Sequence, residues 1–310
     1  MPKIAAIDIG SNAIRMAVAE VSAAGLPQNL KHYREPVRLG TDVFTTGRVG
    51  WETIEATLAA LKKYQLIISS QAAQPVRAVA TEALRRAGNC SEVLQTIELE
   101  TGLKVEIISP QTEAELVLNA LSQKIDLAGR NTLHLELGGG SLELSSVVNG
   151  ILSASQSFEL GAIRLLQNIK TSDKDQALSD TTKLAGSALV WLDEAQKQHQ
   201  MDILIGTGGS LELLADLAVQ ITGSGKKNLL HRDSLERIVD SLIPLDLKQR
   251  MDRFNLKPDR ADVALPAALL LLVLLGRTEL AEIQVPRVGL KEGLLMAIAQ
   301  SLKTGNSNDG

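Results

Sequence analysis

Aromatic side chains are nearly missing from this chain, since Phe, Tyr and Trp together account for 2% of its 310 residues. Proteins that hold single-stranded nucleic acid without reading its sequence normally stack the bases on such rings. The formal net charge of −4 points the same way, because nucleic-acid-binding domains usually carry a basic surface. We therefore expect no nucleic-acid partner, while local groups of Arg and Lys could still bind a smaller anion.

Cysteine and long apolar runs are also scarce. Cys90 is the only cysteine, so the chain has no internal disulfide, which favours a reducing compartment. The longest apolar run, residues 263–276, contains Pro266 and is too short to cross a bilayer. The first residues lack the length of a signal peptide. We expect a cytoplasmic protein without a membrane partner, in which residues 263–276 form a buried helix.

The most informative stretch combines alternating leucines with three consecutive glycines. Leu133, Leu135 and Leu137 alternate before the glycines at 138–140, and Leu142 and Leu144 resume the alternation after Ser141, which predicts a β-hairpin. Glycines let backbone N–H groups approach an anion closely, because no Cβ intervenes. Glu136, just before the turn, could hold a cation that the same anion needs. The alternative is an ordinary hairpin turn with exposed acids.

The start of the chain repeats this pattern 128 positions earlier. On adding 128, Asp8 falls on Glu136, Gly10 falls on Gly138 and Arg15 falls on Glu143. The apolar residues at 7, 9, 14 and 16 fall on the leucines at 135, 137, 142 and 144. A repeat of this length predicts two related domains, whose acid–glycine turns would face one cleft. The alternative is a coincidence between two hairpins of similar composition.

A third glycine turn follows an apolar strand at 203–206. Its sequence, Thr207-Gly208-Gly209-Ser210, leads into a helix, and a helix N-terminus suits a phosphate group. The Gly-Lys-Ser/Thr of a Walker loop and the spacing of a dinucleotide fingerprint are both missing. The turn is therefore a candidate phosphate loop of another kind.

Glu113 and Glu115 are two acids whose position leaves open a role as general base. Ser109 and Pro110 predict a helix start, and Glu113 and Glu115 fall in its first turn, where acids complement the helix dipole. The alternative to such capping is that one of them reaches the cleft and activates water. Arg85, after the strand at 75–80, is a candidate anion ligand, whereas for Arg86 a solvated helix face is favoured.

Periodicity and helix-end residues predict the other elements. They are strands at 4–9 and 14–21, a helix at 51–64, a loop at 69–74, a strand at 75–80, a helix at 93–101 ended by Gly102, a strand at 103–108, helices at 174–198 and 211–219, a helical stretch at 223–258, a last helix from 289 and a disordered tail from 304 to 310.

Taken in order, several blocks of this chain closely resemble the exopolyphosphatase / guanosine pentaphosphate phosphatase family. The blocks are residues 6–12, 77–89, 113–114, 138–144, 160–164, 206–209, 260–262 and 290–293. The resemblance implies an α/β fold of two duplicated ribonuclease H-like domains around a cleft, as in the superfamily of actin, sugar kinases and heat-shock chaperone ATPases. The first domain would cover residues 1–125 and the second 126–310, with the last helix packing back on the first.

The resemblance also implies roles for particular residues. Glu113 and Glu143 would be catalytic, with Glu113 activating the attacking water, while Asp8, Glu136 and Glu143 would hold Mg²⁺. The substrate-binding positions would be Ser11, Asn12, Arg15, Arg85, Gly138, Gly139, Gly140, Ser141, Thr207, Gly208, Gly209 and Ser210. The chain departs from the family at two places, with Glu136 where Asp is usual and Glu115 where Arg is usual.

The implied function is hydrolysis of a phosphoric anhydride. The substrate would be inorganic polyphosphate, from which the terminal phosphate is released, with guanosine pentaphosphate as a second substrate. A homodimer is expected by analogy alone. Two other interpretations stay open: a kinase or ATPase of the same superfamily, and a non-catalytic sensor of polyphosphate or guanosine pentaphosphate.

Overall fold

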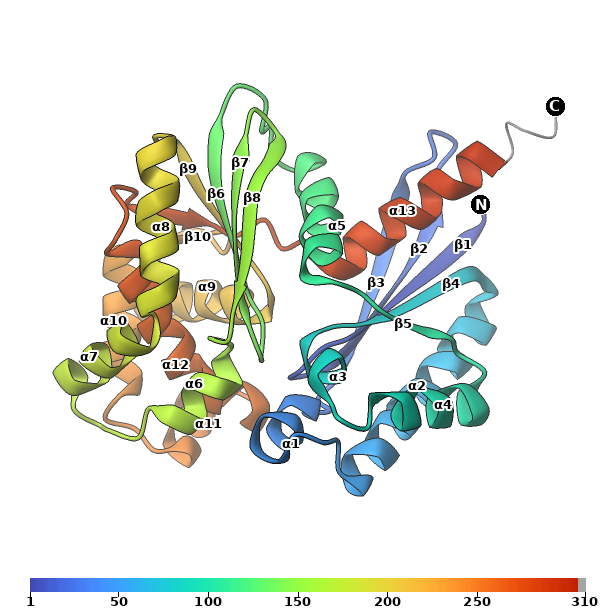
Figure 1. Ribbon diagram of the computed structural model, residues 1–310, viewed down its shortest axis with the longest axis horizontal. Helices are drawn as coiled ribbons and strands as arrows, with labels where there is room; N and C mark the ends of the chain where they lie inside the picture. The colour runs from blue at the N-terminus through green and yellow to red at the C-terminus, as the bar shows by residue number, and fades with distance from the viewer. Residues whose placement is uncertain (306–310) are drawn as a thin grey trace. The chain divides into compact units, whose positions relative to one another are not determined.

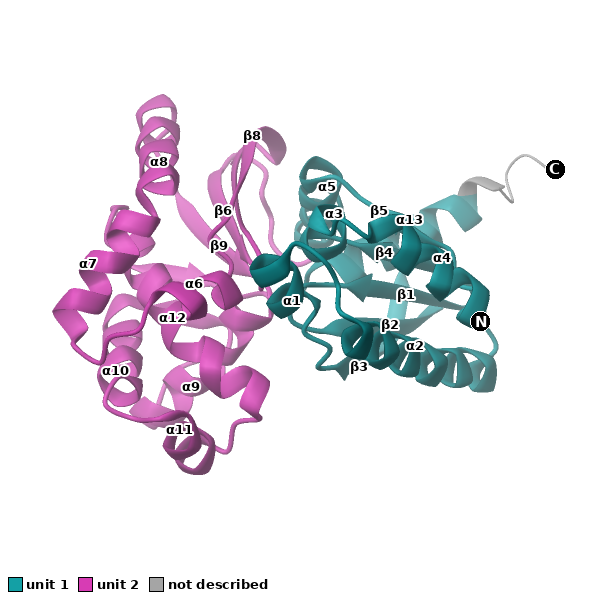
Figure 2. Cartoon of the chain, turned by 60° about the horizontal axis from the view of Figure 1, so that its bottom comes forward, with its two compact units in different colours: residues 1–123, 288–310 teal, residues 124–287 magenta. Residues whose placement is uncertain are grey.

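The computed structural model describes residues 1–305 and divides into two compact units. Unit 1 contains residues 1–123 and the chain from Val288 onward, and unit 2 contains residues 124–287 (Figure 2). The chain therefore passes between the units twice, after Gln123 and after Arg287. The last helix, α13 (Leu290–Gly305), packs against α5 (Pro110–Ser122) within unit 1.

Unit 1 is built on a five-stranded sheet with the strand order β3-β2-β1-β4-β5 (Figure 1). The first three strands run antiparallel, and β4 and β5 run parallel to β1. Their bounds are β1 (Lys3–Ile9), β2 (Ile14–Val21), β3 (Pro27–Glu35), β4 (Ala73–Ala80) and β5 (Val105–Ile107). A sheet with parallel strands needs helices on both of its faces.

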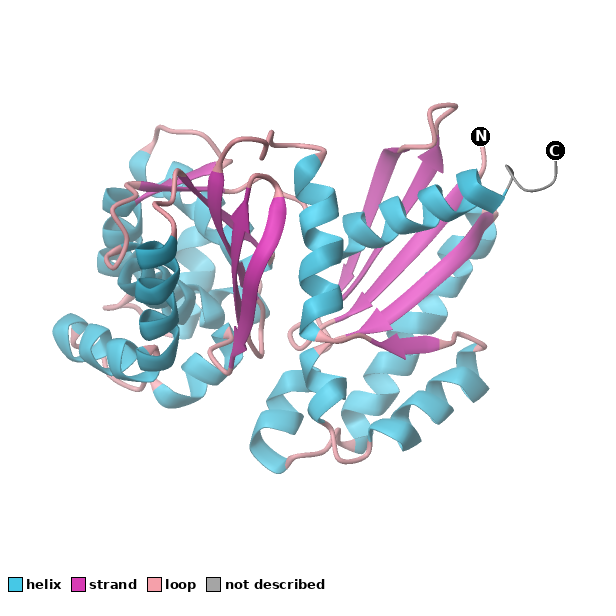
Figure 3. Cartoon of the chain, turned by 45° about the horizontal axis from the view of Figure 1, so that its top comes forward, coloured by secondary structure: helices cyan, strands magenta, loops and turns pink. Residues whose placement is uncertain are grey.

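Alternation along β1 and β2 supplies one apolar face of this sheet. Ala5, Ile7 and Ile9 join Ile14 and Met16 in a core that includes residues of four helices. These helices are α1 (Leu39–Thr46), α2 (Trp51–Gln71), α3 (Glu82–Arg86) and α4 (Cys90–Thr101). On the other face α13 lies across β1 and β2 (Figure 3).

Unit 2 contains a six-stranded sheet with the order β10-β11-β9-β6-β7-β8. Its strands are β6 (Asn131–Leu137), β7 (Leu142–Val148), β8 (Ile151–Phe158), β9 (Ile203–Thr207), β10 (Leu229–His231) and β11 (Glu282–Gln284). Again three antiparallel strands are followed by two strands parallel to the first, here β9 and β11. The short β10 is an addition at the edge, antiparallel to β11.

The helices of unit 2 surround a long buried one. They are α6 (Ala162–Asn168), α7 (Lys174–Leu184), α8 (Gly186–Gln198), α9 (Gly209–Thr222), α10 (Arg232–Leu242), α11 (Leu247–Phe254) and α12 (Pro258–Leu275). The buried helix is α12, which contacts α6, α7, α9, α10 and α11 and contains Pro266. The buried helix expected at 263–276 is thus confirmed, with a start at Pro258.

The 128-residue repeat is confirmed by the pairing of the strands. Adding 128 to each partner of the β1–β2 ladder reproduces the β6–β7 ladder, from Lys3↔Glu20, which becomes Asn131↔Val148, through to the last pair before the turn. The turns agree as well: Gly10 N donates to Ala13 O over 3.2 Å, and the equivalent bond in unit 2 measures 3.0 Å. The two units are therefore copies of one ribonuclease H-like fold.

Several predicted helix boundaries are confirmed, among them the starts at Trp51 and Lys174, and some of the differences have clear physical causes. Gly102 ends α4 in the left-handed conformation, as expected. The loop predicted at 69–74 is wrong, because α2 continues to Gln71 and a single left-handed residue, Ala72, turns the chain into β4. The strand β10 interrupts the helical stretch predicted at 223–258, since it pairs with β11, which is distant in sequence.

Helix α13 includes Gly305, so the tail expected from 304 begins inside a helix, and its residues 306–310 lie outside the described part of the chain. Within residues 1–305, no helix combines the length and apolar character that crossing a bilayer requires.

Candidate active site

Next to the turn of the first hairpin, an acidic residue lies opposite an arginine. Asp8 of β1 pairs directly with Arg15 of β2, and Arg15 Nη1 lies 3.6 Å from Asp8 Oδ2. Burial raises the pKa of Asp8 above its usual value, while the positive charges of Arg15 and Lys291 oppose that rise. Unit 1 therefore provides a buried acid whose charged form is favoured by neighbouring cations but disfavoured more strongly by burial.

Lys291 comes to this hairpin from the first turn of α13. Its Nζ lies 2.9 Å from Glu292 Oε1, and Glu292 Oε2 accepts a hydrogen bond of 2.8 Å from Gly289 N. The block at 290–293 is thus explained: it fixes the start of α13 and brings a cation toward Asp8. Sequence reasoning missed Lys291 because nothing in the spacing links the end of the chain to β1.

The second hairpin differs at the equivalent position. Glu136 of β6 pairs directly with Glu143 of β7, so both carboxylates lie on the same face of the sheet. Glu143 is buried and Glu136 is half-buried. Ser157 of β8 pairs with Glu143 in turn, and its Oγ donates a hydrogen bond of 2.9 Å to Glu143 Oε1. Two carboxylates side by side supply the oxygen ligands that a hard cation such as Mg²⁺ prefers.

The glycine turn of unit 2 has its carbonyl groups fixed by the segment after β8. Gly138 O accepts from Ala162 N over 3.0 Å, and Gly139 O accepts from Ile163 N over 2.9 Å. Within residues 1–305, the amide of Gly139 donates to no backbone carbonyl, nor does that of Gly140. Anchored carbonyls and uncommitted N–H groups are the requirements of an anion-binding loop.

Gly161 explains how the two segments can pack so closely. A Cβ at this position would lie 2.3 Å from the backbone of Gly139 and Gly140, which is a severe overlap. Arg164 completes the contact, because its Nε donates to Gly140 O over 2.9 Å and its Nη1 lies 3.1 Å from Glu159 Oε2. The block at 160–164 therefore shapes the glycine turn.

The third loop, after β9, presents the N-terminus of α9. Gly208 has a φ of 99°, and a Cβ there would lie 2.6 Å from Leu137 O, so the loop rests against the end of β6. No side chain caps α9, and Arg260 donates a hydrogen bond to Gly209 O. Ser210 is buried in the first turn. This arrangement suits a phosphate at the first amides of α9.

Thr207 of this loop is held by a buried histidine that sequence reasoning did not single out. His134 Nε2 lies 2.9 Å from Thr207 Oγ1. Burial lowers the pKa of His134 to about 4, so the ring is neutral at physiological pH. Because His134 sits two residues before Glu136 on β6, it connects the acid-bearing strand to the phosphate loop. The spacing of His134 from the other histidines does not match a metal-binding motif. A hydrogen bond between side chains of two strands far apart in sequence cannot be recognised from the sequence.

Glu113 occupies the predicted helix start. Ser109 Oγ accepts a hydrogen bond of 3.1 Å from Thr112 N, which confirms the N-cap, and Glu113 in the first turn of α5 is buried. Arg85 Nη1 lies 3.9 Å from Glu113 Oε2. The exposed Glu115 accepts instead from Gln111 Nε2 on the outer side of the helix. Of the two acids, Glu113 is the one that the fold turns inward.

Arg85 is fixed in place by other contacts. Its Nη1 donates to Ile108 O over 2.6 Å, and its Nη2 lies 2.9 Å from Glu82 Oε2. Arg86 binds the other carboxylate oxygen of Glu82, with half of its side chain exposed. The phosphate-binding role of Arg85 stays a prediction. The contacts with Ile108 and Glu82 hold the guanidinium group of Arg85 beside Glu113.

In each unit the predicted residues gather at the carboxyl ends of the parallel strands, where open α/β sheets bind their ligands. Unit 1 holds Asp8, Ser11, Asn12, Arg15, Arg85 and Glu113, and unit 2 holds Glu136, Gly138, Gly139, Gly140, Ser141, Glu143, Thr207, Gly208, Gly209 and Ser210. Neither unit, over the described residues, contains three or more His, Cys, Asp or Glu side chains grouped to bind a metal. The predicted ligands are divided, with Asp8 in unit 1 and two glutamates in unit 2.

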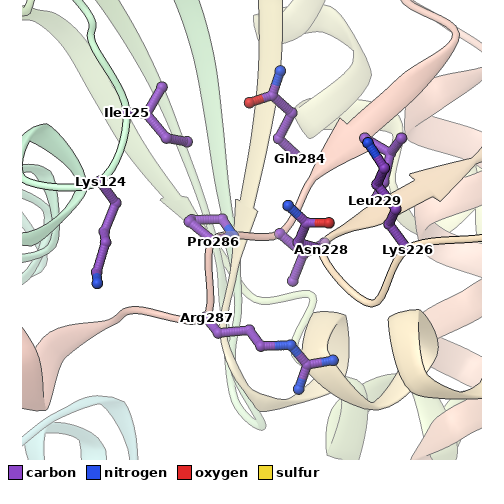
Figure 4. Close-up of a pocket in the computed structure, with 9 residues that line it drawn as sticks. Lys124, Ile125, Lys226, Asn228, Leu229, Gln284, Pro286 and Arg287 are labelled. Carbon is purple, nitrogen blue, oxygen red and sulfur yellow. The ribbon is translucent and has the colours of Figure 1, made fainter.

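A cavity of about 480 Å³ lies elsewhere in unit 2 (Figure 4). Its lining includes Lys124, Asn228, Gln284 and Arg287, and the predicted site residues do not contribute to it. Figure 4 shows Lys124 directed away from Asn228 and Gln284. The candidate site is therefore defined by strand ends and turns and does not coincide with this cavity.

Two copies of a ribonuclease H-like unit, each with acids and a glycine turn at its strand ends, place the chain in the superfamily of actin and the sugar kinases. The Ppx/GppA phosphatase family matches residues 17–302. The chain belongs to that family.

Its relatives agree with this assignment. Exopolyphosphatase 2 of Mycobacterium tuberculosis is 31% identical over 283 residues, which cover 85% of this chain and 86% of that protein. Exopolyphosphatase 1 of Mycobacterium leprae is 23% identical over 98% of this chain and 92% of its own length. Among solved structures, an exopolyphosphatase from Cytophaga hutchinsonii superposes with a TM-score of 0.89 at 25% identity, covering 96% of this chain and 98% of that one. The Aquifex aeolicus Ppx/GppA family member gives 0.77 at 26% identity, covering 97% and 98%.

Proposed function

We propose that this chain is an exopolyphosphatase, which hydrolyses the terminal phosphoric anhydride bond of inorganic polyphosphate with the help of Mg²⁺. Family membership supports a phosphatase, and several of its relatives carry the name exopolyphosphatase. The observation that carries the proposal is the carboxylate pair Glu136 and Glu143, which adjoins a glycine turn whose carbonyls are anchored from behind. A cation site beside an anion loop is what phosphoryl transfer needs.

Each unit would contribute a different part of the reaction. In unit 1, the buried carboxylate of Glu113 would take a proton from the attacking water, while Arg85 offers a fixed positive charge beside it. In unit 2, the N–H groups of Gly139 and Gly140 and the first amides of α9 would bind the phosphoryl oxygens, on which negative charge is spread. Attack of water on the terminal phosphorus would then break the bond to the bridging oxygen and release orthophosphate.

The metal would be held by residues that suit it. Carboxylates of Asp8, Glu136 and Glu143 are hard oxygen donors, and Mg²⁺ in phosphate sites commonly uses one or two carboxylates together with water and phosphate oxygens. When bound, Mg²⁺ supplies neutralisation of charge on the phosphate chain. Glu136 stands where the family usually has Asp, and its longer side chain is half-buried opposite Glu143.

The proposal is tested by measuring phosphate release from long polyphosphate, guanosine pentaphosphate and ATP, side by side, with and without Mg²⁺. Release from polyphosphate is expected, and it should require Mg²⁺. Tight polyphosphate binding with no release would contradict the proposal and support a sensor. Phosphate transfer from ATP to a sugar would support a kinase instead.

Glu113→Gln, with Glu115→Gln as its matched control, tests the base. Both substitutions remove one carboxylate from α5, but Glu113 is buried in the first turn near Arg85, whereas Glu115, two residues further on, is exposed. Glu113→Gln should keep polyphosphate binding and lower the rate of release by roughly 10²–10⁴-fold, because general-base catalysis contributes about that much. Glu115→Gln should behave like the unsubstituted protein. Equal activity of the two variants would show that Glu113 is not the base.

A further inference from the structure

Ser157 of β8 donates a hydrogen bond to Glu143 of β7, its partner in the β7–β8 ladder. The two residues are partners in register, so their side chains leave the sheet on the same face. The bond from Ser157 Oγ to Glu143 Oε1 measures 2.9 Å, and Glu143 is 4% exposed. A buried carboxylate with one oxygen tied to a hydroxyl has a restricted orientation.

We propose that Ser157 is a positioning residue, which holds one oxygen of Glu143 so that the other is aimed at the cation or water of the site. The inference rests on the proposed function, because it assigns Glu143 to the reacting centre. Partners that orient a ligating carboxylate affect a site strongly even though they never touch the metal.

The same strands contain an internal comparison. Two residues away on the same face, Ser155 of β8 pairs with Ser145 of β7, and their hydroxyls lie 3.0 Å apart. Ser155 and Ser157 are both half-buried and both bond a side chain across the same ladder. They differ in that only Ser157 bonds an acid. Loss of the Ser155 hydroxyl therefore reproduces the structural damage of losing the Ser157 hydroxyl, without touching Glu143.

The duplicated fold shows that this contact is particular to unit 2. In unit 1, the residue equivalent to Glu143 is Arg15, which pairs on β3 with Arg34. Across three neighbouring strands, unit 1 therefore has the paired residues Asp8, Arg15 and Arg34. At the equivalent positions unit 2 has Glu136, Glu143 and Ser157. The serine hydroxyl at the last of these positions adds a hydrogen-bond donor without adding charge.

Ser157→Val and Ser157→Thr form the test, with Ser155→Val as the control. Val and Thr have nearly the same shape and both favour strands, so they differ mainly in the hydroxyl. Three quantities are measured for each full-length variant: the affinity for Mn²⁺ without substrate, by calorimetric titration, and kcat and KM for polyphosphate. Circular dichroism verifies that each variant is folded.

Ser157→Val should weaken Mn²⁺ binding or lower kcat by roughly 10- to 100-fold, which is the usual effect of losing an orienting partner. Ser157→Thr should restore most of the loss, and Ser155→Val should match the unsubstituted protein. The proposal is overturned if Ser157→Val and Ser155→Val behave alike, or if Thr and Val at position 157 are equally impaired. Should no variant hydrolyse polyphosphate, the proposed function fails, and the Mn²⁺ titrations still decide whether Ser157 positions Glu143.

Discussion

His134 should make the stability of unit 2 fall as the solution becomes acidic. Burial holds the pKa of this histidine at about 4 in the folded chain, against 6.5 for an ordinary histidine. Between these values the unfolded chain binds a proton that the folded chain does not, so the free energy of unfolding rises with pH in this window. The stability is fully present above pH 6.5 and is lost progressively as the pH falls toward 4.

The size of the effect follows from the two pKa values. One pKa unit corresponds to about 1.4 kcal/mol, so the full loss below the folded pKa is roughly 3 kcal/mol, and the loss between pH 8 and pH 5 is about 2 kcal/mol. This is a large part of the stability of a typical domain. His134→Gln should remove it, because an amide can still hydrogen-bond Thr207 Oγ1 and does not titrate.

Urea unfolding at pH 8 and pH 5 measures the effect. Trp191 in α8 reports on unit 2, and Trp51, which is 66% exposed in unit 1, is first replaced by Phe so that its fluorescence does not interfere. Relative to the unsubstituted protein, His134→Gln should gain about 2 kcal/mol on going from pH 8 to pH 5. His231→Gln, which removes an exposed histidine from the same unit, is the control. A difference between His134→Gln and the unsubstituted protein that does not change with pH would refute the reasoning.

Two further substitutions test how the site is supported. Gly161→Ala should lower the free energy of unfolding of unit 2 by about 1–3 kcal/mol and reduce phosphate release, since its Cβ would overlap Gly139. Gly186→Ala is the control and should have neither effect, because its Cβ would meet nothing within 4 Å. Arg85→Lys should lower stability by about 1–3 kcal/mol in urea unfolding, because Lys keeps the charge but lacks the planar guanidinium whose Nη1 and Nη2 bond Ile108 O and Glu82 separately. A large increase in KM for polyphosphate with unchanged stability would instead make Arg85 a substrate ligand.

The hairpins and their repeat could be predicted because their signals are local. Alternating apolar residues and consecutive glycines define strand, turn and strand without reference to the rest of the chain. The register bears this out, since Leu135 pairs with Leu144 and Leu137 pairs with Leu142 on the face that the alternation indicates. Similarly, the start of α5 could be predicted locally, because Ser109 is a favoured N-cap residue and Pro110 a favoured first helical residue.

The supporting residues could not be predicted in this way. Ser157 and His134 act through partners on neighbouring strands, and Lys291 reaches Asp8 from the far end of the sequence. The strand β8 is also mostly exposed and polar, so it lacks the alternation of apolar and polar residues that distinguishes a strand from a loop. What decides these contacts is strand order and register, which depend on long-range packing.

The exchange of one charge separates the two copies of the hairpin. In unit 1, the acid Asp8 faces Arg15 and is also subject to the positive charge of Lys291, and both cations favour its ionised form. In unit 2, Glu136 faces Glu143, and like charges directly opposite each other destabilise a ladder unless a cation lies between or beside them. The two ladders share every backbone pair, and the charge is reversed where Arg15 corresponds to Glu143. Duplication of one hairpin followed by divergence explains this combination better than two unrelated hairpins do. Under the proposed function, unit 2 therefore provides the stronger anchor for Mg²⁺, and removing Glu143 should impair metal binding more than removing Asp8.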